Sequence, residues 1–128
     1  MNNTYKKLFV NLSNHPYEKW GEQQKQKASD YGRVVDIPFP MIPPTMPAHE
    51  VVALATKYAD DILSLANGVE VSVHVMGEMC FTFSFVSIIS GRGVKCYAST
   101  TERIVREKEN GIKETLFQFV SFRQYKTL

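Results

Sequence analysis

The fold of this chain is decided by residues 69–98, whose sequence is VEVSVHVMGEMCFTFSFVSIISGRGVKCYA. Residues 69–76 alternate apolar and polar side chains, which is the pattern of a β-strand with one buried face. Residues 94–98 form a second strand-like run. Whether these two strands are parallel depends on what connects them, because parallel neighbours need a crossover connection.

The connecting segment, residues 79–90, has two interpretations. Phe81 to Phe85 alternates like a strand, and its composition favours that structure. Met79, Phe83, Val86 and Ile89 or Ser90 instead share one face of a helix. We predict a buried helix, because a repeated strand–helix order needs a crossover here and Gly91-Arg92-Gly93 is typical of a helix end.

Strand-like runs also occur on either side of this segment. Residues 7–12 predict a buried first strand, and residues 33–40 predict a second strand that prolines bring to an end. Towards the C-terminus, residues 104–108 and 112–125 flank Glu109-Asn110-Gly111, and Asn-Gly between two strand-like runs indicates a β-hairpin.

Two further helices are predicted between the strands. Residues 18–31 form the first, which ends at Gly32 and turns Trp20, Ala28 and Tyr31 inward. Residues 49–65 form the second, after a stiff proline-rich loop. Its inward positions are Val52, Leu54, Ala55, Tyr58, Ala59, Ile62, Leu63 and Leu65.

This order predicts the α/β fold class: a three-layer Rossmann-like sandwich with a mainly parallel sheet and a C-terminal β-hairpin. The 128 residues fit a single domain, residues 1–128, and 44% hydrophobic content suffices for a core. No apolar run is long enough to span a bilayer, and residues 1–7 lack the features of a signal peptide. We therefore expect a cytoplasmic protein with Cys80 and Cys96 as buried, reduced thiols.

Charge is informative through its distribution. The net charge is only +2, so we expect neither membrane binding nor binding of long nucleic acid. From Arg92 to Leu128, however, eight Lys and Arg residues face four Glu residues. This excess favours an anionic partner near the C-terminal third, although a solvated basic face explains it about equally well.

A candidate site is predicted where the parallel strands end, because ligands of open α/β sheets bind there. Ser13 and Asn14 can donate to phosphate or cap a helix, Gly77 permits close approach of a backbone, and Arg103 can fork onto phosphate. The candidate catalytic residues are Ser13, His15 and Arg103, and the candidate ligand-binding residues are Asn11, Asn14, Gly77, Glu78, Met79, Ser99, Thr100 and Thr101.

Each of these residues also has a purely structural interpretation. Ser13 and Asn14 are ordinary turn and cap residues, and the run Ser99-Thr100-Thr101 is ordinary turn chemistry. His15 beside a proline is more often a loop residue than a catalyst, and Glu78 suits the start of a helix. His74, inside a strand, is most simply a packed neutral histidine.

Recognised cofactor and metal motifs are missing from the sequence. It contains no GxGxxG, P-loop, HExxH, CxxC pair or GxSxG. His15, His49 and His74 also lack the spacing of metal ligands. We therefore expect no cofactor and no metal.

Two stretches resemble a known group of proteins. Residues 9–16, FVNLSNHP, and residues 35–38, VDIP, resemble the opening of small CRISPR-associated proteins related to CARF domains and ring nucleases. Residues 99–103, STTER, resemble the polar, basic loop with which CARF domains hold their ligand. The similarity covers the first 40 residues and, more weakly, residues 77–103. Unlike the relatives that carry an effector nuclease domain, this chain is expected to act without one.

The resemblance implies a homodimer that binds cyclic oligoadenylate across its two-fold axis and cleaves it without metal, with the ribose 2′-OH as internal nucleophile. Ser13 and Asn14 would then hold phosphate, His15 would act as acid or base, and Arg103 would stabilise charge. Two alternatives stay open: a non-catalytic nucleotide-sensing module, and a partner-binding α/β protein without a small ligand.

The C-terminal hairpin independently predicts a homodimer. Phe117 and Phe119 are expected on one face of its second strand and Phe122 on the other, with Tyr125 beyond. A strand with aromatic residues on both faces needs cover that so short a chain does not supply.

Overall fold

The computed structural model describes residues 6–128; residues 1–5, which belong to the segment used to predict localisation, lie outside the described residues. The elements are β1 (Lys7–Ser13), the short 3-10 helix η1 (Tyr17–Lys19), α1 (Glu22–Ser29), β2 (Arg33–Pro38), α2 (Ala48–Ala66), β3 (Glu70–Val75), α3 (Met79–Ser90), β4 (Lys95–Glu107) and β5 (Lys113–Gln124).

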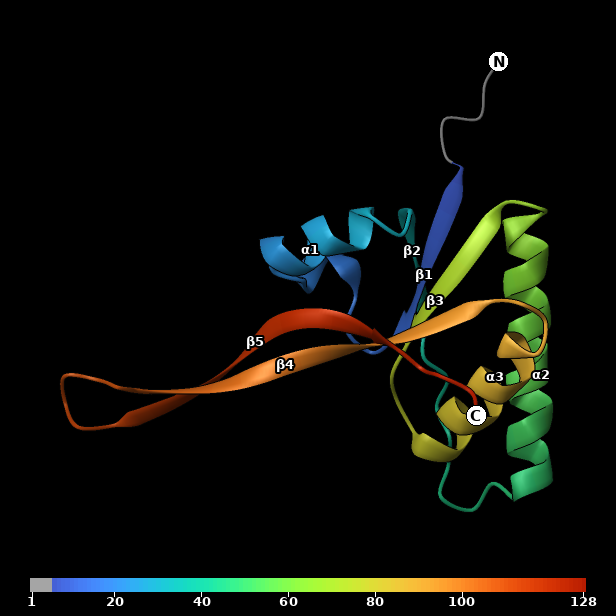
Figure 1. Cartoon of the computed structure of the whole chain (residues 1–128). Coiled ribbons are helices and arrows are strands. Elements are labelled where there is room, and N and C mark those ends of the chain that lie inside the picture. Colours follow the sequence, from blue (N-terminus) through green and yellow to red (C-terminus); the bar gives the residue numbers. More distant parts are fainter. Residues whose placement is uncertain (1–5) are drawn as a thin grey trace.

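The strands form one five-stranded sheet in the order β2-β1-β3-β4-β5. β2, β1, β3 and β4 are parallel, and β5 runs antiparallel to β4 (Figure 1). The protein is thus an α/β protein with a mostly parallel sheet that ends in an antiparallel hairpin. Strand order reverses between β1 and β3, because β2 follows β1 to one side of the sheet and β3 lies on the other.

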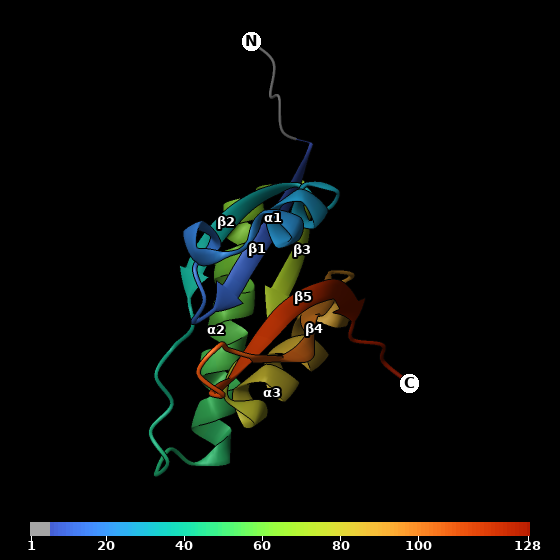
Figure 2. The ribbon, with the colours of Figure 1, turned by 90° about the vertical axis from the view of Figure 1, so that its left-hand side faces the viewer.

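Helices cover the parallel part of the sheet on both faces (Figures 1 and 2). α2 and α3 pack against one face, where Val10 and Leu12 of β1 meet Val73 and Val75 of β3. α1 lies on the opposite face over Phe9. The alternation along β1 and β3 explains this division, because successive side chains of a strand point to opposite faces.

The ambiguous segment is a helix, as predicted. Glu78 caps α3 by accepting a hydrogen bond from the Phe81 backbone N–H (2.7 Å), and Gly91 follows its last turn. The predicted inward face is wrong in part, because Met79 and Phe83 are exposed. The residues of α3 that are buried are Phe81, Thr82, Phe85, Val86 and Ile89.

The structure corrects the predicted end of the strand that begins at residue 94. Residues 99–103 are not a loop: they lie inside β4, which continues without a break into the hairpin. Sequence alone placed a turn here because Ser and Thr are common in turns. Pairing with β5 along the whole length of β4 overrides that preference.

A β-bulge corrects the predicted faces of β5. Thr100 pairs with Ser121 and Thr101 with Phe119, so Val120 is an extra residue in β5. Because one residue is added, Phe119 and Phe122 come to the same side, and their rings are 4.9 Å apart. The prediction that they face opposite ways is therefore wrong.

Smaller corrections concern the first two helices and one cysteine. The helix predicted over residues 18–31 is split into η1 and the shorter α1, although Trp20 and Ala28 are buried as expected. In α2, Val52 and Leu65 are exposed, while Val51 and Ala66 are buried. Cys96 is buried but Cys80 is exposed, at the start of the outer face of α3.

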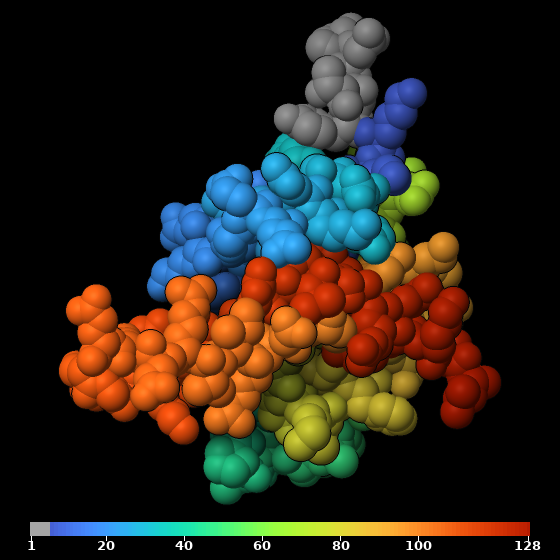
Figure 3. All heavy atoms as spheres, turned by 60° about the vertical axis from the view of Figure 1, so that its left-hand side comes forward, coloured from blue at the N-terminus to red at the C-terminus, as the bar shows by residue number. Residues whose placement is uncertain are grey.

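β4 and β5 extend beyond the helices as a two-stranded arm (Figure 1). Only Ser72, Val73 and His74 of β3 pair with β4, so most of β4 pairs with β5 alone. Figure 3 shows α1 lying directly over the part of this hairpin nearest the body. No helix among residues 6–128 is long and apolar enough to cross a membrane.

Candidate functional site

A polar stripe crosses the sheet on its α1 face. Asn11 of β1 lies in register with Asp36 of β2 on one side and with His74 of β3 on the other. Ser99 of β4 extends the stripe, with its Oγ 3.3 Å from His74 Nε2. Side chains from four neighbouring strands thus form one connected network.

The amide of Asn11 organises this network. Its Nδ2 donates to Asp36 Oδ1 and to the His15 carbonyl oxygen, each at 2.9 Å. Its Oδ1 accepts from Ser13 Oγ at 2.8 Å and lies 2.9 Å from His74 Nδ1. Because both partners of Nδ2 can only accept, the orientation of the amide is fixed.

The network also determines the tautomer of His74. Asn11 Oδ1 can only accept, so His74 Nδ1 carries the proton and Nε2 presents its lone pair to Ser99 Oγ. His74 is enclosed by the rings of Trp20 and Phe122. Burial, with a smaller contribution from the charge of His15, lowers the pKa of His74 to about 4. The expected neutral, packed histidine is confirmed, and the neutral ring is a proton acceptor facing a hydroxyl.

The loop after β1 is held by the same network. The His15 carbonyl oxygen accepts from Asn11 Nδ2 and from Trp20 Nε1, both at 2.9 Å. The Ser13 hydroxyl donates to Asn11 and accepts from the His15 backbone N–H (3.2 Å). Ser13 is therefore committed to internal bonds, whereas the backbone of His15 is fixed and its side chain is exposed.

A cavity of about 910 Å³ lies above this network, at the carboxyl ends of β1 and β3, and we call it the strand-end cavity. The loop after β1, the start of α1 and the hairpin form its walls. It is lined by Ser13, Asn14, His15, Lys19, Gly21, Glu22, Gln23, Gln24, His74, Met76, Ser99, Thr101, Ile104, Arg106, Leu116, Phe117, Gln118 and Phe119.

The structure gathers part of the predicted site in this cavity. Its lining includes Ser13, Asn14, His15, Ser99 and Thr101. The other predicted residues lie elsewhere: Asn11 is buried beneath the cavity, Glu78 caps α3, Thr100 bonds across to Ser121, Arg103 is exposed opposite Phe117 on the arm, and Gly77 and Met79 line a second cavity beside α3.

Sequence reasoning missed the two basic residues of the strand-end cavity. Lys19 comes from η1 and Arg106 from the arm. Finding Arg106 required knowing that β4 continues through residues 99–103, because only then does the hairpin extend along one side of the cavity. Asp36 was also missed as a member of the network, since its position beside Asn11 depends on the register of β1 and β2.

Among residues 6–128, no group of three or more His, Cys, Asp or Glu side chains is placed to hold a metal ion. The chemistry that the cavity offers is hydrogen bonding from hydroxyl and amide groups, positive charge from Lys19 and Arg106, and proton transfer at His15 and at Ser99 with His74.

Comparison with known proteins gives one result at the level of the family. No curated protein and no solved structure matches the chain. Residues 7–123 match the family described as Uncharacterized protein MJ1673 family, a match that covers every helix and nearly all of the sheet. The chain therefore belongs to the MJ1673 family.

Proposed function

We propose that the strand-end cavity binds a nucleotide, specifically a cyclic oligoadenylate, and that the protein cleaves this ring without a metal ion. The observation that carries the proposal is the position of the cavity. It lies where strand order reverses between β1 and β3, which is where open α/β sheets bind their ligands.

The charge of the cavity suits phosphate. Lys19 of η1 and Arg106 of the arm both line it, and Gly21 and Glu22 place the first turn of α1 on its edge. The first backbone N–H groups of a helix have no partner within the helix and attract anions. The Glu22 carboxylate opposes this attraction, so the two basic side chains supply most of the expected affinity.

The proposed cleavage needs the ribose 2′-OH to be aligned with the phosphorus atom, and it needs two proton transfers. The ribose 2′-oxygen forms a bond to phosphorus while the bond from phosphorus to the 5′-oxygen breaks, which leaves a 2′,3′-cyclic phosphate and a 5′-hydroxyl. The 2′-OH loses a proton to a base and the 5′-oxygen gains one. His15 is one candidate for these transfers, and Ser99 with His74 behind it is the other.

The proposal includes a three-layer Rossmann-like sandwich, a homodimer and a cytoplasmic location. Helices on both faces of the sheet support the first. The apolar residues exposed on the arm, among them Val105 and Ile112, support the second. The free thiols of Cys80 and Cys96 agree with the third.

The test is incubation of the protein with labelled cyclic tetra-adenylate and cyclic hexa-adenylate, with and without EDTA. We expect linear products with 2′,3′-cyclic phosphate ends in both conditions, and no cleavage of a 2′-deoxy ring. Binding without linear products would favour a nucleotide-sensing module. A requirement for added Mg²⁺ or Mn²⁺ would contradict the mechanism.

Variants identify the groups involved. His15→Ala is expected to slow cleavage by roughly 10²–10⁴-fold if its imidazole transfers a proton, and His74→Gln tests the second candidate in the same assay. The sequence points to Arg103 as the phosphate ligand, but the geometry favours Arg106. We expect Arg106→Ala to weaken binding by about 1–3 kcal/mol, with Arg103→Ala as its matched comparison.

A further inference from the structure

Among residues 6–128, no other element covers the two large apolar side chains on the outer face of α3. Phe81, Phe85 and Ile89 bury its inner face. On the outside, Met79 is 83% exposed and Phe83 is 75% exposed. Two large apolar side chains exposed one helical turn apart mark this outer face as a place where another molecule can bind.

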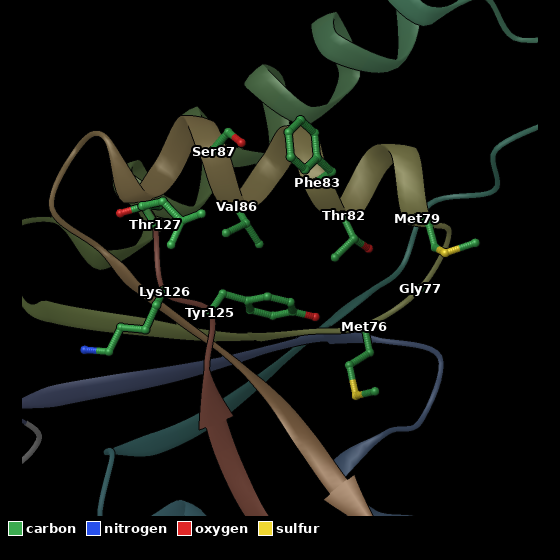
Figure 4. A pocket seen from close by; sticks show the side chains of 11 residues that line it. Met76, Gly77, Met79, Thr82, Phe83, Val86, Ser87, Tyr125, Lys126 and Thr127 are labelled. Atoms are coloured by element: carbon green, nitrogen blue, oxygen red, sulfur yellow. The ribbon is translucent and has the colours of Figure 1, made fainter.

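A cavity of about 660 Å³ lies along this face, and we call it the α3 cavity. Figure 4 shows Thr82, Phe83 and Val86 above it and Tyr125 below it, with Met76 at one end. Its volume lies within the range of small-molecule sites, and such sites are mainly apolar with few polar groups. The C-terminal residues Lys126 and Thr127 also contribute to its wall.

Thr82 supplies the polar group. Its side chain projects from α3 toward the side of the cavity where Tyr125 lies (Figure 4). Thr82 is 9% exposed, and its Oγ1 is buried without a hydrogen-bond partner among the described residues. A buried hydroxyl without a partner is destabilising, and a ligand in the cavity with a donor or acceptor would remove that cost.

Met76 connects the two cavities. Its side chain belongs to the lining of the α3 cavity and to that of the strand-end cavity. Its Sδ lies 3.1 Å from Ser99 Oγ, the hydroxyl that faces His74. A ligand that reaches past Met76 therefore places one end against α3 and the other over the polar network.

We propose that the α3 cavity is a base-binding subsite, which takes the flat, largely apolar base of a nucleotide whose phosphate lies in the strand-end cavity. This inference rests on the proposed function. A planar ring fills the space between Tyr125 on one side and Val86 and Thr82 on the other, the thioethers of Met76 and Met79 contact its faces or edge, and one ring nitrogen or amino group bonds to Thr82. Stacking on an aromatic ring discriminates little between bases, so the hydrogen bond to the Thr82 hydroxyl adds selectivity.

The test uses adenosine and inorganic phosphate as separate probes, followed through the methyl resonances of the protein. We expect adenosine to shift the methyl groups of Met76, Met79 and Val86, and phosphate to leave Met79 and Val86 unchanged. Thr82→Val keeps the shape of the side chain but removes the hydroxyl. It should weaken adenosine binding roughly fivefold, the loss expected for one hydrogen bond, while thermal stability stays equal or rises.

The matched control is Thr56→Val, because Thr56 is also a helical threonine but lies on α2 with its Oγ1 bonded to the Val52 carbonyl oxygen. Adenosine affinity should be unchanged in this variant. Adenosine that shifts none of the three methyl groups would overturn the inference. So would a Phe83→Glu variant whose mass in solution is half that of the wild type, since the outer face would then be an interface between copies.

Failure of this inference is distinguishable from failure of the proposed function. If cyclic tetra-adenylate binds and is cleaved while adenosine leaves the α3 methyl groups unchanged, only the base-binding subsite is wrong. If adenosine shifts them and no cyclic oligoadenylate binds, the subsite stands and the proposed function is wrong.

Discussion

His74 makes stability depend on pH at the level of a single residue. Its imidazole is buried and its pKa in the folded protein is about 4, against an ordinary value of 6.5. Between these two values the unfolded chain binds the proton more readily than the folded one. The effect of His74 on the free energy of unfolding is therefore absent above about pH 6.5. As the pH is lowered towards 4, protonation of the unfolded chain reduces the free energy of unfolding by up to about 3 kcal/mol.

Urea unfolding at a series of pH values from about 7.5 to about 4 measures this loss. In His74→Gln the part of the pH dependence that belongs to the imidazole should disappear. His49→Gln is the control, because His49 is exposed at the start of α2 and should leave the wild-type profile intact. An unchanged profile in His74→Gln would show that other groups cause the acid sensitivity.

Gly77 is needed because the ring of Phe39 packs too close for a side chain, and not because its backbone conformation requires glycine. A Cβ atom added there would lie 2.3 Å from the ring of Phe39, which packs edge-on against Phe81 in the core. We expect Gly77→Ala to destabilise the fold by roughly 1–3 kcal/mol, because the ring must move. Gly21→Ala is the matched control, since nothing lies within 4 Å of its added Cβ; it should cost less than about 1 kcal/mol.

At the level of the element, α3 offers a comparison between its two faces. Phe85 is 0% exposed in the core, whereas Phe83 projects outward two residues earlier. Phe85→Ala should lower the free energy of unfolding by about 3–5 kcal/mol, and Phe83→Ala by less than about 1 kcal/mol. Equal losses in calorimetry would mean that the outer face is covered in solution.

The existence of α3 was predictable, but its orientation was not. Helical spacing in residues 79–90 fits two apolar faces, and sequence alone gives no reason to prefer Phe81 and Phe85 over Met79 and Phe83 as the buried pair. The choice is made by the contacts of Phe81 with Phe39 and Tyr58, which come from distant parts of the chain.

The length of β4 could not be predicted either, because it too depends on contacts with a distant part of the chain. Ser99, Thr100 and Thr101 suit a turn by local preference, but Thr100 instead bonds to the Ser121 side chain (2.8 Å) within the ladder. The Asn-Gly turn of the hairpin was read correctly, because that signal is local. The loop after β1 was also placed correctly, whereas Arg106 depended on the path of β4.

For the whole molecule, the arm predicts self-association. A two-stranded ribbon is marginally stable alone in water, and this one exposes Val105, Ile112 and Val120. We expect a homodimer by light scattering at micromolar concentration, about twice the chain mass of 14.6 kDa. Val105→Glu should shift the population towards monomer, because it places a charge in the covered surface.

The control for this experiment is Leu65→Glu, which introduces the same charge at an exposed apolar position on α2, far from the arm in sequence. Its mass should stay that of the wild type. A wild-type protein that is monomeric at every concentration measured would remove the dimer from the proposal.

The arm has a further consequence for the order in which the chain folds. Its strands are joined by a short turn, so β4 and β5 can pair while little loop entropy is lost. Asn11 and His74, by contrast, are 63 residues apart, and β1 cannot meet β3 until the intervening helices have compacted. The hairpin is thus expected to appear early but fleetingly, and to gain a long lifetime only when β4 docks on β3 through Ser72, Val73 and His74. The imidazole at the centre of the polar network is then also one of the last residues to reach its final surroundings.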